Sequence, residues 1–158
     1  MPSDTSRNSR PRIVVLVGLP GSGKSTYLEH LGVTALSSDT IRVLLADDPT
    51  DQSIHRKVFA TLRYLLRQRL EIGRPVTYVD ATNLTLWERR PYLKLGQLYD
   101  CTVEAIFFDI PLEVCRERNR RRGRIVPDDV MEKMAAKLAP PSKQEGFSRI
   151  QVVKLGRR

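Results

Sequence analysis

The segment GLPGSGKS, residues 18–25, constrains this chain more than any other, because it directly follows the apolar run at residues 13–17. Glycine at positions 18, 21 and 23 allows backbone angles that a Cβ would forbid, so successive N–H groups can curl around an anionic phosphate. Residues 26–31 then have a helical pattern, and the N-terminus of a helix adds partial positive charge at the same place. A strand, a glycine-rich turn and a helix in this order predict a phosphate-binding loop that holds a nucleoside triphosphate.

The polar side chains of this loop suit ATP together with Mg²⁺. Lys24 supplies a mobile cation for the β- and γ-phosphates, and the hydroxyl of Ser25 is placed to bind Mg²⁺. The residues expected to contact the nucleotide are Gly18, Gly21, Ser22, Gly23, Lys24, Ser25 and Thr26. A glycine-rich turn that matches by chance is the alternative, but it does not account for the strand before the loop and the helix after it.

The rest of the chain alternates strand and helix patterns. Strands are expected at residues 13–17, 34–37, 76–80, 103–110 and 149–154, and helices at 26–31, 39–45, 52–72, 86–99, 112–122 and 128–138. Strands separated by helices predict an α/β fold with a parallel five-stranded sheet, helices on both faces and an arginine-rich helical lid. We expect one P-loop kinase-like domain at residues 13–158 and a disordered N-terminal arm at residues 1–12.

The chain has 27 Lys and Arg against 18 Asp and Glu, a net charge of +9 over 158 residues. This excess favours a polyanionic partner such as RNA or DNA, although a solvated basic surface would have the same composition. Cys101 and Cys115 lack metal-ligand spacing and are expected to be reduced, as in the cytoplasm. No apolar run reaches the roughly 18 residues that span a membrane, so no membrane contact is expected, and no stable protein partner is predicted.

The second predicted strand leads into Asp39, which places a carboxylate at the carboxyl edge of the sheet, where ligands bind in such folds. This carboxylate could act as the general base that takes a proton from an acceptor hydroxyl. Arg42 lies one helical turn further and could hold a second anionic group of the acceptor. The alternative is that Asp39 is a helix N-cap and Arg42 a solvated helix residue.

The third predicted strand ends at Asp80, a position that suits a carboxylate near Mg²⁺. Ala81 follows it, whereas an ATPase that performs mechanical work usually has a glutamate there, so the sequence favours transfer to a bound substrate. Asn83, in the same loop, is a candidate substrate contact, although such residues are also common turn formers.

Residues 116–124 hold six arginines in nine positions. Arg116 and Arg120 lie four residues apart, on one face of the predicted helix, and could close over a phosphoryl group during its transfer. Gly123 would allow the segment after the helix to hinge as a lid. The alternative is a solvated basic face. Trp87, finally, could either stack on a base or pack into the core.

These residues together resemble the kinase module of bacterial polynucleotide kinase-phosphatases from about Ile13 to Val153. The shared landmarks are residues 18–25, Ser38-Asp39-x-x-Arg42, residues 47–48 and 51–53, residues 79–83, residues 115–119 and residues 145–147. The resemblance implies an ATP-dependent kinase that transfers the γ-phosphate to a 5′-hydroxyl end of RNA or DNA. It implies that Asp39 is the general base, that Arg42 contacts the 3′-phosphate of the terminal nucleotide, and that Arg116 and Arg120 are lid arginines on the ATP phosphates.

Two other functions are compatible with the same loop. A small-molecule kinase, similar to zeta-toxin-like sugar-nucleotide kinases or antibiotic kinases, would also keep the loop and an aspartate after the second strand. A nucleotide-dependent switch or adaptor would bind ATP without any acceptor. The basic lid and the net charge favour the polynucleotide acceptor over the small molecule, because a small neutral acceptor needs no such field.

Overall fold

The computed structural model describes residues 10–123 and 126–156. In chain order the elements are β1 (Arg12–Val17), α1 (Lys24–Leu31), β2 (Leu36–Ser37), α2 (Ser38–Ala46), α3 (His55–Glu71), β3 (Val76–Asp80), α4 (Leu86–Leu98), β4 (Thr102–Phe108), α5 (Leu112–Arg121), α6 (Asp128–Lys137), the 3₁₀ helix η2 (Lys143–Glu145) and β5 (Arg149–Val153). Most of the predicted N-terminal arm lies outside the described residues, and its last residue, Arg12, already belongs to β1.

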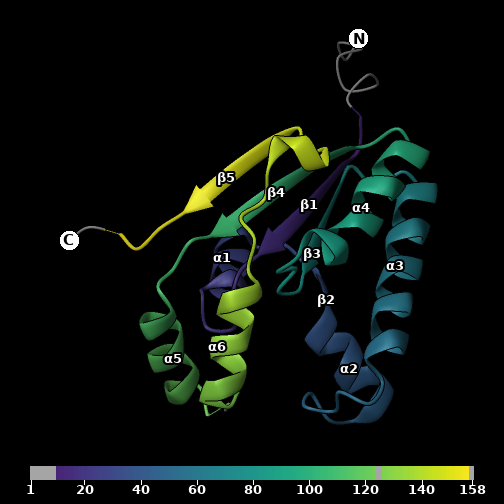
Figure 1. Cartoon of the computed structure of the whole chain (residues 1–158). Coiled ribbons are helices and arrows are strands. Elements are labelled where there is room, and N and C mark those ends of the chain that lie inside the picture. The colour runs from purple at the N-terminus through teal and green to yellow at the C-terminus, as the bar shows by residue number, and fades with distance from the viewer. Residues whose placement is uncertain (1–9, 124–125, 157–158) are drawn as a thin grey trace.

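The strands form one sheet in the order β2-β3-β1-β4-β5, and every pairing is parallel. Figure 1 shows β1, β4 and β5 side by side and pointing the same way. The register pairs Val15 with Val79 and Val17 with Phe107, while Ser37 pairs with Asp80 at the edge. The predicted five-stranded parallel sheet is therefore confirmed, and the carboxyl ends of β1, β2 and β3 lie along one edge.

Strand β1 is buried on both sides, because its residues alternate between two cores. Ile13, Val15 and Val17 belong to a core covered by α3 and α4, whereas Val14 and Leu16 belong to a core covered by α1, α5 and α6. This placement explains why β1 is a continuous apolar run rather than an alternating one. The predicted helices on both faces of the sheet are confirmed as well.

A buried ion pair that the sequence did not indicate joins two distant segments. The guanidinium of Arg89, in α4, donates to both carboxylate oxygens of Glu145 in η2 at 2.9 and 3.0 Å. The same group donates to the backbone carbonyls of Asn83, Leu84 and Ala139. Arg89 is fully buried, so this one side chain ties the loop after β3 to the segment between α6 and β5.

We expect Arg89→Ala to lower the free energy of unfolding by about 3–5 kcal/mol, because it leaves the carboxylate of Glu145 buried without its partner. Urea unfolding followed by circular dichroism measures this loss. Lys94→Ala, on the exposed side of the same helix, is the matched control and should stay within about 0.5 kcal/mol of wild type. Equal stability of the two variants would contradict the structural role of Arg89.

Candidate nucleotide and acceptor site

The loop between β1 and α1 is shaped by its glycines. Gly21 has φ +80° and Gly23, the N-cap of α1, has φ +100°, both in the region that favours glycine. A Cβ on Gly21 would lie 2.5 Å from the carbonyl oxygen of Cys115, and one on Gly18 would lie 2.7 Å from the hydroxyl of Ser22. The loop therefore packs tightly against α5 and curls around the N-terminus of α1, as a phosphate cradle requires.

The ammonium of Lys24 lies inside this loop and donates to the carbonyl oxygens of Gly18 and Leu19 at 2.7 and 2.9 Å. Burial lowers the pKa of Lys24 to about 8, even though the negative charges of Asp80 and Asp39 oppose the shift. At neutral pH the side chain is still a cation. It is thus a partly buried positive charge held beside the place where phosphate would bind.

The carboxylates of Asp80 and Asp39 interact electrostatically with Lys24 at the carboxyl edge of the sheet. Burial raises the pKa of Asp80, and the charge of Lys24 opposes this while that of Asp39 adds to it. Asp39 is half exposed in the first turn of α2. The N-cap of α2 is Ser37, whose hydroxyl accepts from the N–H of Thr40 at 3.3 Å, so Asp39 is not the cap.

Arg42 is only 5% exposed, which excludes the alternative of a solvated helix residue. Its guanidinium lies 3.5 Å from the carboxylate of Asp39, one turn earlier in α2. Its Nε is buried and has no hydrogen-bond partner among the described residues. A buried guanidinium with an unused donor, beside a half-exposed carboxylate, is suited to receive an anionic group.

The structure places the arginines of α5 differently from expectation. Arg116 is ion-paired with Glu132, and Arg120 lies 3.1 Å from Asp128, so both point to α6 instead of the loop. Arg118 and Arg122 instead face the phosphate-binding loop.

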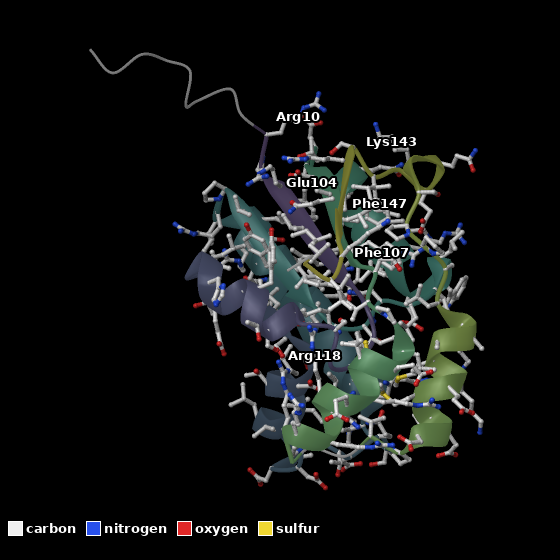
Figure 2. The ribbon with its side chains drawn as sticks, turned by 90° about the vertical axis from the view of Figure 1, so that its left-hand side faces the viewer. Arg10, Glu104, Phe107, Arg118, Lys143 and Phe147 are labelled. Atoms are coloured by element: carbon white, nitrogen blue, oxygen red, sulfur yellow. The ribbon has the colours of Figure 1, made fainter. Side chains whose placement is uncertain are left out.

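The guanidinium of Arg118 lies 3.5 Å from the carbonyl oxygen of Gly21, and that of Arg122 donates to the hydroxyl of Thr26 at 3.2 Å. Figure 2 labels Arg118 on α5. Both arginine pairs, 116/120 and 118/122, have a spacing of four residues, and they lie about half a helical turn apart around α5. The spacing in the sequence therefore could not show which pair faces the loop. Arg124, the last arginine of the cluster, lies outside the described residues.

Asn83, which the sequence suggested as a substrate contact, is instead buried inside the protein. It is 1% exposed, has φ +48°, and donates from its amide to the carbonyl oxygen of Leu16 at 2.8 Å. Its role is to join the loop after β3 to the end of β1, and it is too deeply buried to contact a substrate.

A groove of about 460 Å³ lies beside the loop. Its lining includes Tyr27 and Phe108, whose rings meet edge to face with centroids 5.5 Å apart, and the arginines Arg118 and Arg122. The sequence did not indicate that residues 153–156, the last residue of β5 and the three that follow it, complete this groove, because only the parallel pairing of β5 with β4 brings them there.

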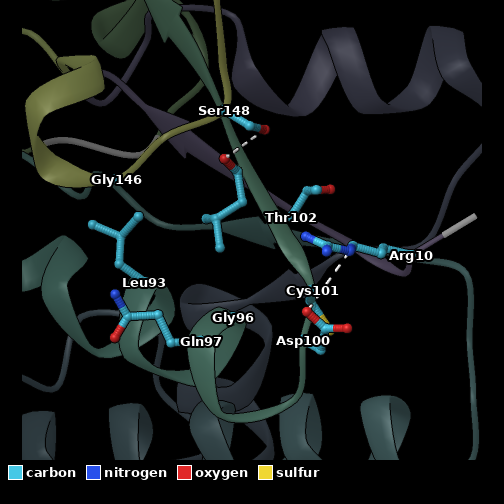
Figure 3. A pocket seen from close by; sticks show the side chains of 10 residues that line it. Arg10, Leu93, Gly96, Gln97, Asp100, Cys101, Thr102, Gly146 and Ser148 are labelled. Atoms are coloured by element: carbon cyan, nitrogen blue, oxygen red, sulfur yellow. Dashed lines mark hydrogen bonds and ion pairs between the residues drawn. The ribbon is translucent and has the colours of Figure 1, made fainter.

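A second hollow, of about 310 Å³, lies at the opposite edge of the sheet, where the strands begin (Figure 3). Arg10 lies across it, 3.7 Å from Asp100. None of the predicted phosphate-binding residues lines this hollow.

The residues proposed for Mg²⁺ are compatible with that ion. Ser25, at the start of α1, and Asp80, at the end of β3, offer the hard oxygen donors that Mg²⁺ prefers when a substrate supplies further ligands. Within residues 10–123 and 126–156 there is no group of three or more His, Cys, Asp or Glu side chains that could hold a metal ion by itself. None of the described helices is long and apolar enough to cross a membrane.

Residues 13–141 match the sequence profile of the AAA_33 family, described as an AAA domain. The chain belongs to this family. L-seryl-tRNA(Sec) kinase of Methanococcus maripaludis is 25% identical over 136 residues, which are 82% of this chain and 53% of that protein. The bifunctional polynucleotide phosphatase/kinase of Schizosaccharomyces pombe is 22% identical over 96% of this chain and 36% of its own length.

Among solved structures, a sugar kinase from Janibacter sp. HTCC2649 has the same fold, with a TM-score of 0.64 and 22% identity over 91% of this chain and 85% of that chain. The fold of this AAA_33 protein is therefore that of P-loop kinases, in agreement with the expectation from the sequence. It spans about half or less of the length of the two curated relatives.

The partly buried Lys24 makes the free energy of unfolding depend on pH. The pKa of Lys24 is about 8 in the folded protein against an ordinary 10.5, so between these values the unfolded chain binds more protons and the free energy of unfolding rises with pH. Relative to that of Lys24→Met, the free energy of unfolding of wild type should rise by on the order of 2 kcal/mol between about pH 7.5 and about pH 10. Urea unfolding of both proteins across this range measures the gain, and a constant difference would contradict the burial of the ammonium.

Proposed function

We propose that this protein is a kinase that transfers the γ-phosphate of ATP to the 5′-hydroxyl end of RNA or DNA in the presence of Mg²⁺. The observation that carries the proposal is the pairing of Asp39 with the buried Arg42 beside Lys24. A carboxylate to take the hydroxyl proton and a guanidinium to hold a second anion suit an acceptor that is itself a phosphate ester. The net charge of +9 is consistent with such a polyanionic substrate.

In the proposed reaction the residues around the loop hold the triphosphate and neutralise its charge. The loop N–H groups and Lys24 bind the phosphates, and Arg118 and Arg122 approach them from α5. The groove beside Tyr27 and Phe108 has room for the nucleoside. Mg²⁺, when bound, would supply further positive charge at the β- and γ-phosphates, with Ser25 and Asp80 as the residues that hold it.

The acceptor side is formed by α2. A carboxylate oxygen of Asp39 takes the proton of the 5′-hydroxyl, whose oxygen then forms a bond to the γ-phosphorus while the bond from that phosphorus to the bridging β–γ oxygen breaks. ADP leaves with the electron pair of the broken bond. Arg42 holds the 3′-phosphate of the terminal nucleotide and so positions the hydroxyl for in-line attack.

Two curated relatives support a nucleic-acid acceptor, since one is a tRNA kinase and the other a polynucleotide phosphatase/kinase. A small-molecule acceptor is the second candidate, favoured by the sugar kinase with the same fold. Salt distinguishes them, because each phosphate contact steepens the dependence of log affinity on log salt by about 0.7–0.9. A neutral sugar would show no such slope.

The direct test is incubation with γ-labelled ATP, Mg²⁺ and matched RNA and DNA oligomers that end in a 5′-hydroxyl, with 5′-phosphorylated oligomers as blanks. We expect label on the hydroxyl-ended oligomers alone. Asp39→Ala should lower kcat by about 10² or more with little change in ATP affinity. Asp100→Ala, an exposed aspartate at the far edge of the sheet, is the control. Label on sugars but on no oligomer would overturn the proposal.

The two arginine pairs of α5 are compared in the same assay. Arg118→Ala should lower kcat by about 10² or more, because its guanidinium faces the loop and an arginine on a transferring phosphoryl group is worth about 10³–10⁵. Arg120→Ala, which removes the exposed pair with Asp128, should change kcat less than about threefold. If Arg120→Ala lowered kcat more than Arg118→Ala does, the original assignment of Arg116 and Arg120 as the lid arginines would be favoured instead.

A further inference from the structure

The first turn of α4 presents an indole to solvent. Trp87 is 77% exposed, so it is not the core residue that its helical spacing allowed. The guanidinium of Arg90 lies 5.9 Å from the centre of its ring, within the range of a cation–π contact. An exposed aromatic ring supported by a cation is the kind of surface on which nucleic-acid bases stack.

Trp87 begins a basic stripe along one side of α4. Arg90 and Lys94 follow at intervals of three and four residues, which places all three side chains on one face of the helix, and all three are exposed. The one acidic residue of α4, Glu88, points elsewhere, since its carboxylate accepts from the N–H of Leu84 at 3.1 Å. Pro91 has no N–H to give to the carbonyl of Trp87, which leaves that carbonyl outside the helical hydrogen-bond series.

The stripe starts at the edge of the sheet that carries the acceptor site. The loop between Asp80 and α4 is fixed there, because Asn83 is bonded to the end of β1 and Leu84 packs in the same core as Met131 of α6. From Trp87 to Lys94 the helix advances about 10 Å, away from that edge. A strand whose end lies at Asp39 could therefore continue over the indole and along α4.

We propose that Trp87 stacks on a base of the acceptor strand downstream of its 5′ end, while Arg90 and Lys94 contact the phosphates that follow. The inference rests on the proposed function and makes the substrate more specific: the acceptor is a single-stranded segment several nucleotides long. A nucleoside 3′-phosphate or a dinucleotide fills the site at Asp39 and Arg42 but does not reach the stripe.

Trp87 is the one tryptophan of the chain, so its fluorescence reports directly on stacking. Titration with a single-stranded 5′-hydroxyl decamer should quench this fluorescence, and titration with ATP alone should not. The double substitution of Arg90 and Lys94 by Ala should reduce the salt slope of decamer binding by about 0.7 for each lost phosphate contact.

Kinetics give the second measurement. Trp87→Ala should raise the ratio of KM for the decamer to KM for a dinucleotide about fivefold or more, and Trp87→Phe should restore most of the difference. Tyr64→Ala, which removes an exposed aromatic ring from α3, is the matched control and should leave the ratio unchanged. Since both substrates are phosphorylated at the same site, a loss of fold would not change the ratio in this way.

The outcomes separate the inference from the proposed function. If the decamer is phosphorylated but neither quenches the fluorescence nor responds to Trp87→Ala, the stripe is not part of the acceptor path and the inference is overturned. If wild type phosphorylates no oligomer of any length, the proposed function itself is wrong. Quenching together with the shifted KM ratio supports both.

Discussion

The placement of β1 at the centre of the sheet is the constraint on which the rest of the structure depends. Its side chains enter both cores, and the phosphate-binding loop leaves its carboxyl end between β3 and β4. The tight approach of Gly21 to the backbone of α5 then fixes the loop against the helix that carries Arg118. A shift of β1 by one residue would exchange its two buried faces and move the loop away from both neighbours.

The site brings together partly buried charges of opposite sign, and its proposed chemistry depends on them. The burial that lowers the pKa of Lys24 also raises the pKa of Asp80, and each group limits the shift of the other. Arg42 is buried beside Asp39 with an unused donor. Such groups are costly to bury in the absence of a ligand, and an incoming anion can use them without further reorganisation.

Two sets of buried hydrogen bonds, which involve none of the proposed catalytic residues, hold the loop after β3 in place. The bidentate pair of Arg89 and Glu145 anchors the loop after β3 to the chain before β5, and Asn83 anchors the same loop to β1. This anchoring defines where α4 begins, and with it the position of Trp87 and the basic stripe. Structural side chains in this region thus determine which surface an acceptor strand could follow.

The sequence by itself determined the loop, the order of strands and helices, and the positions of Asp39 just after β2 and of Asp80 at the end of β3. These follow from local glycine geometry and apolar periodicity. Only the tertiary structure decided which arginines of α5 face the loop, since Arg116 and Arg118 begin two pairs of equal spacing and the packing of α6 selects between them. It also decided that Asn83 is buried and that Trp87 is exposed, because burial depends on which elements pack around a residue, and this is not encoded in the spacing of one helix or loop.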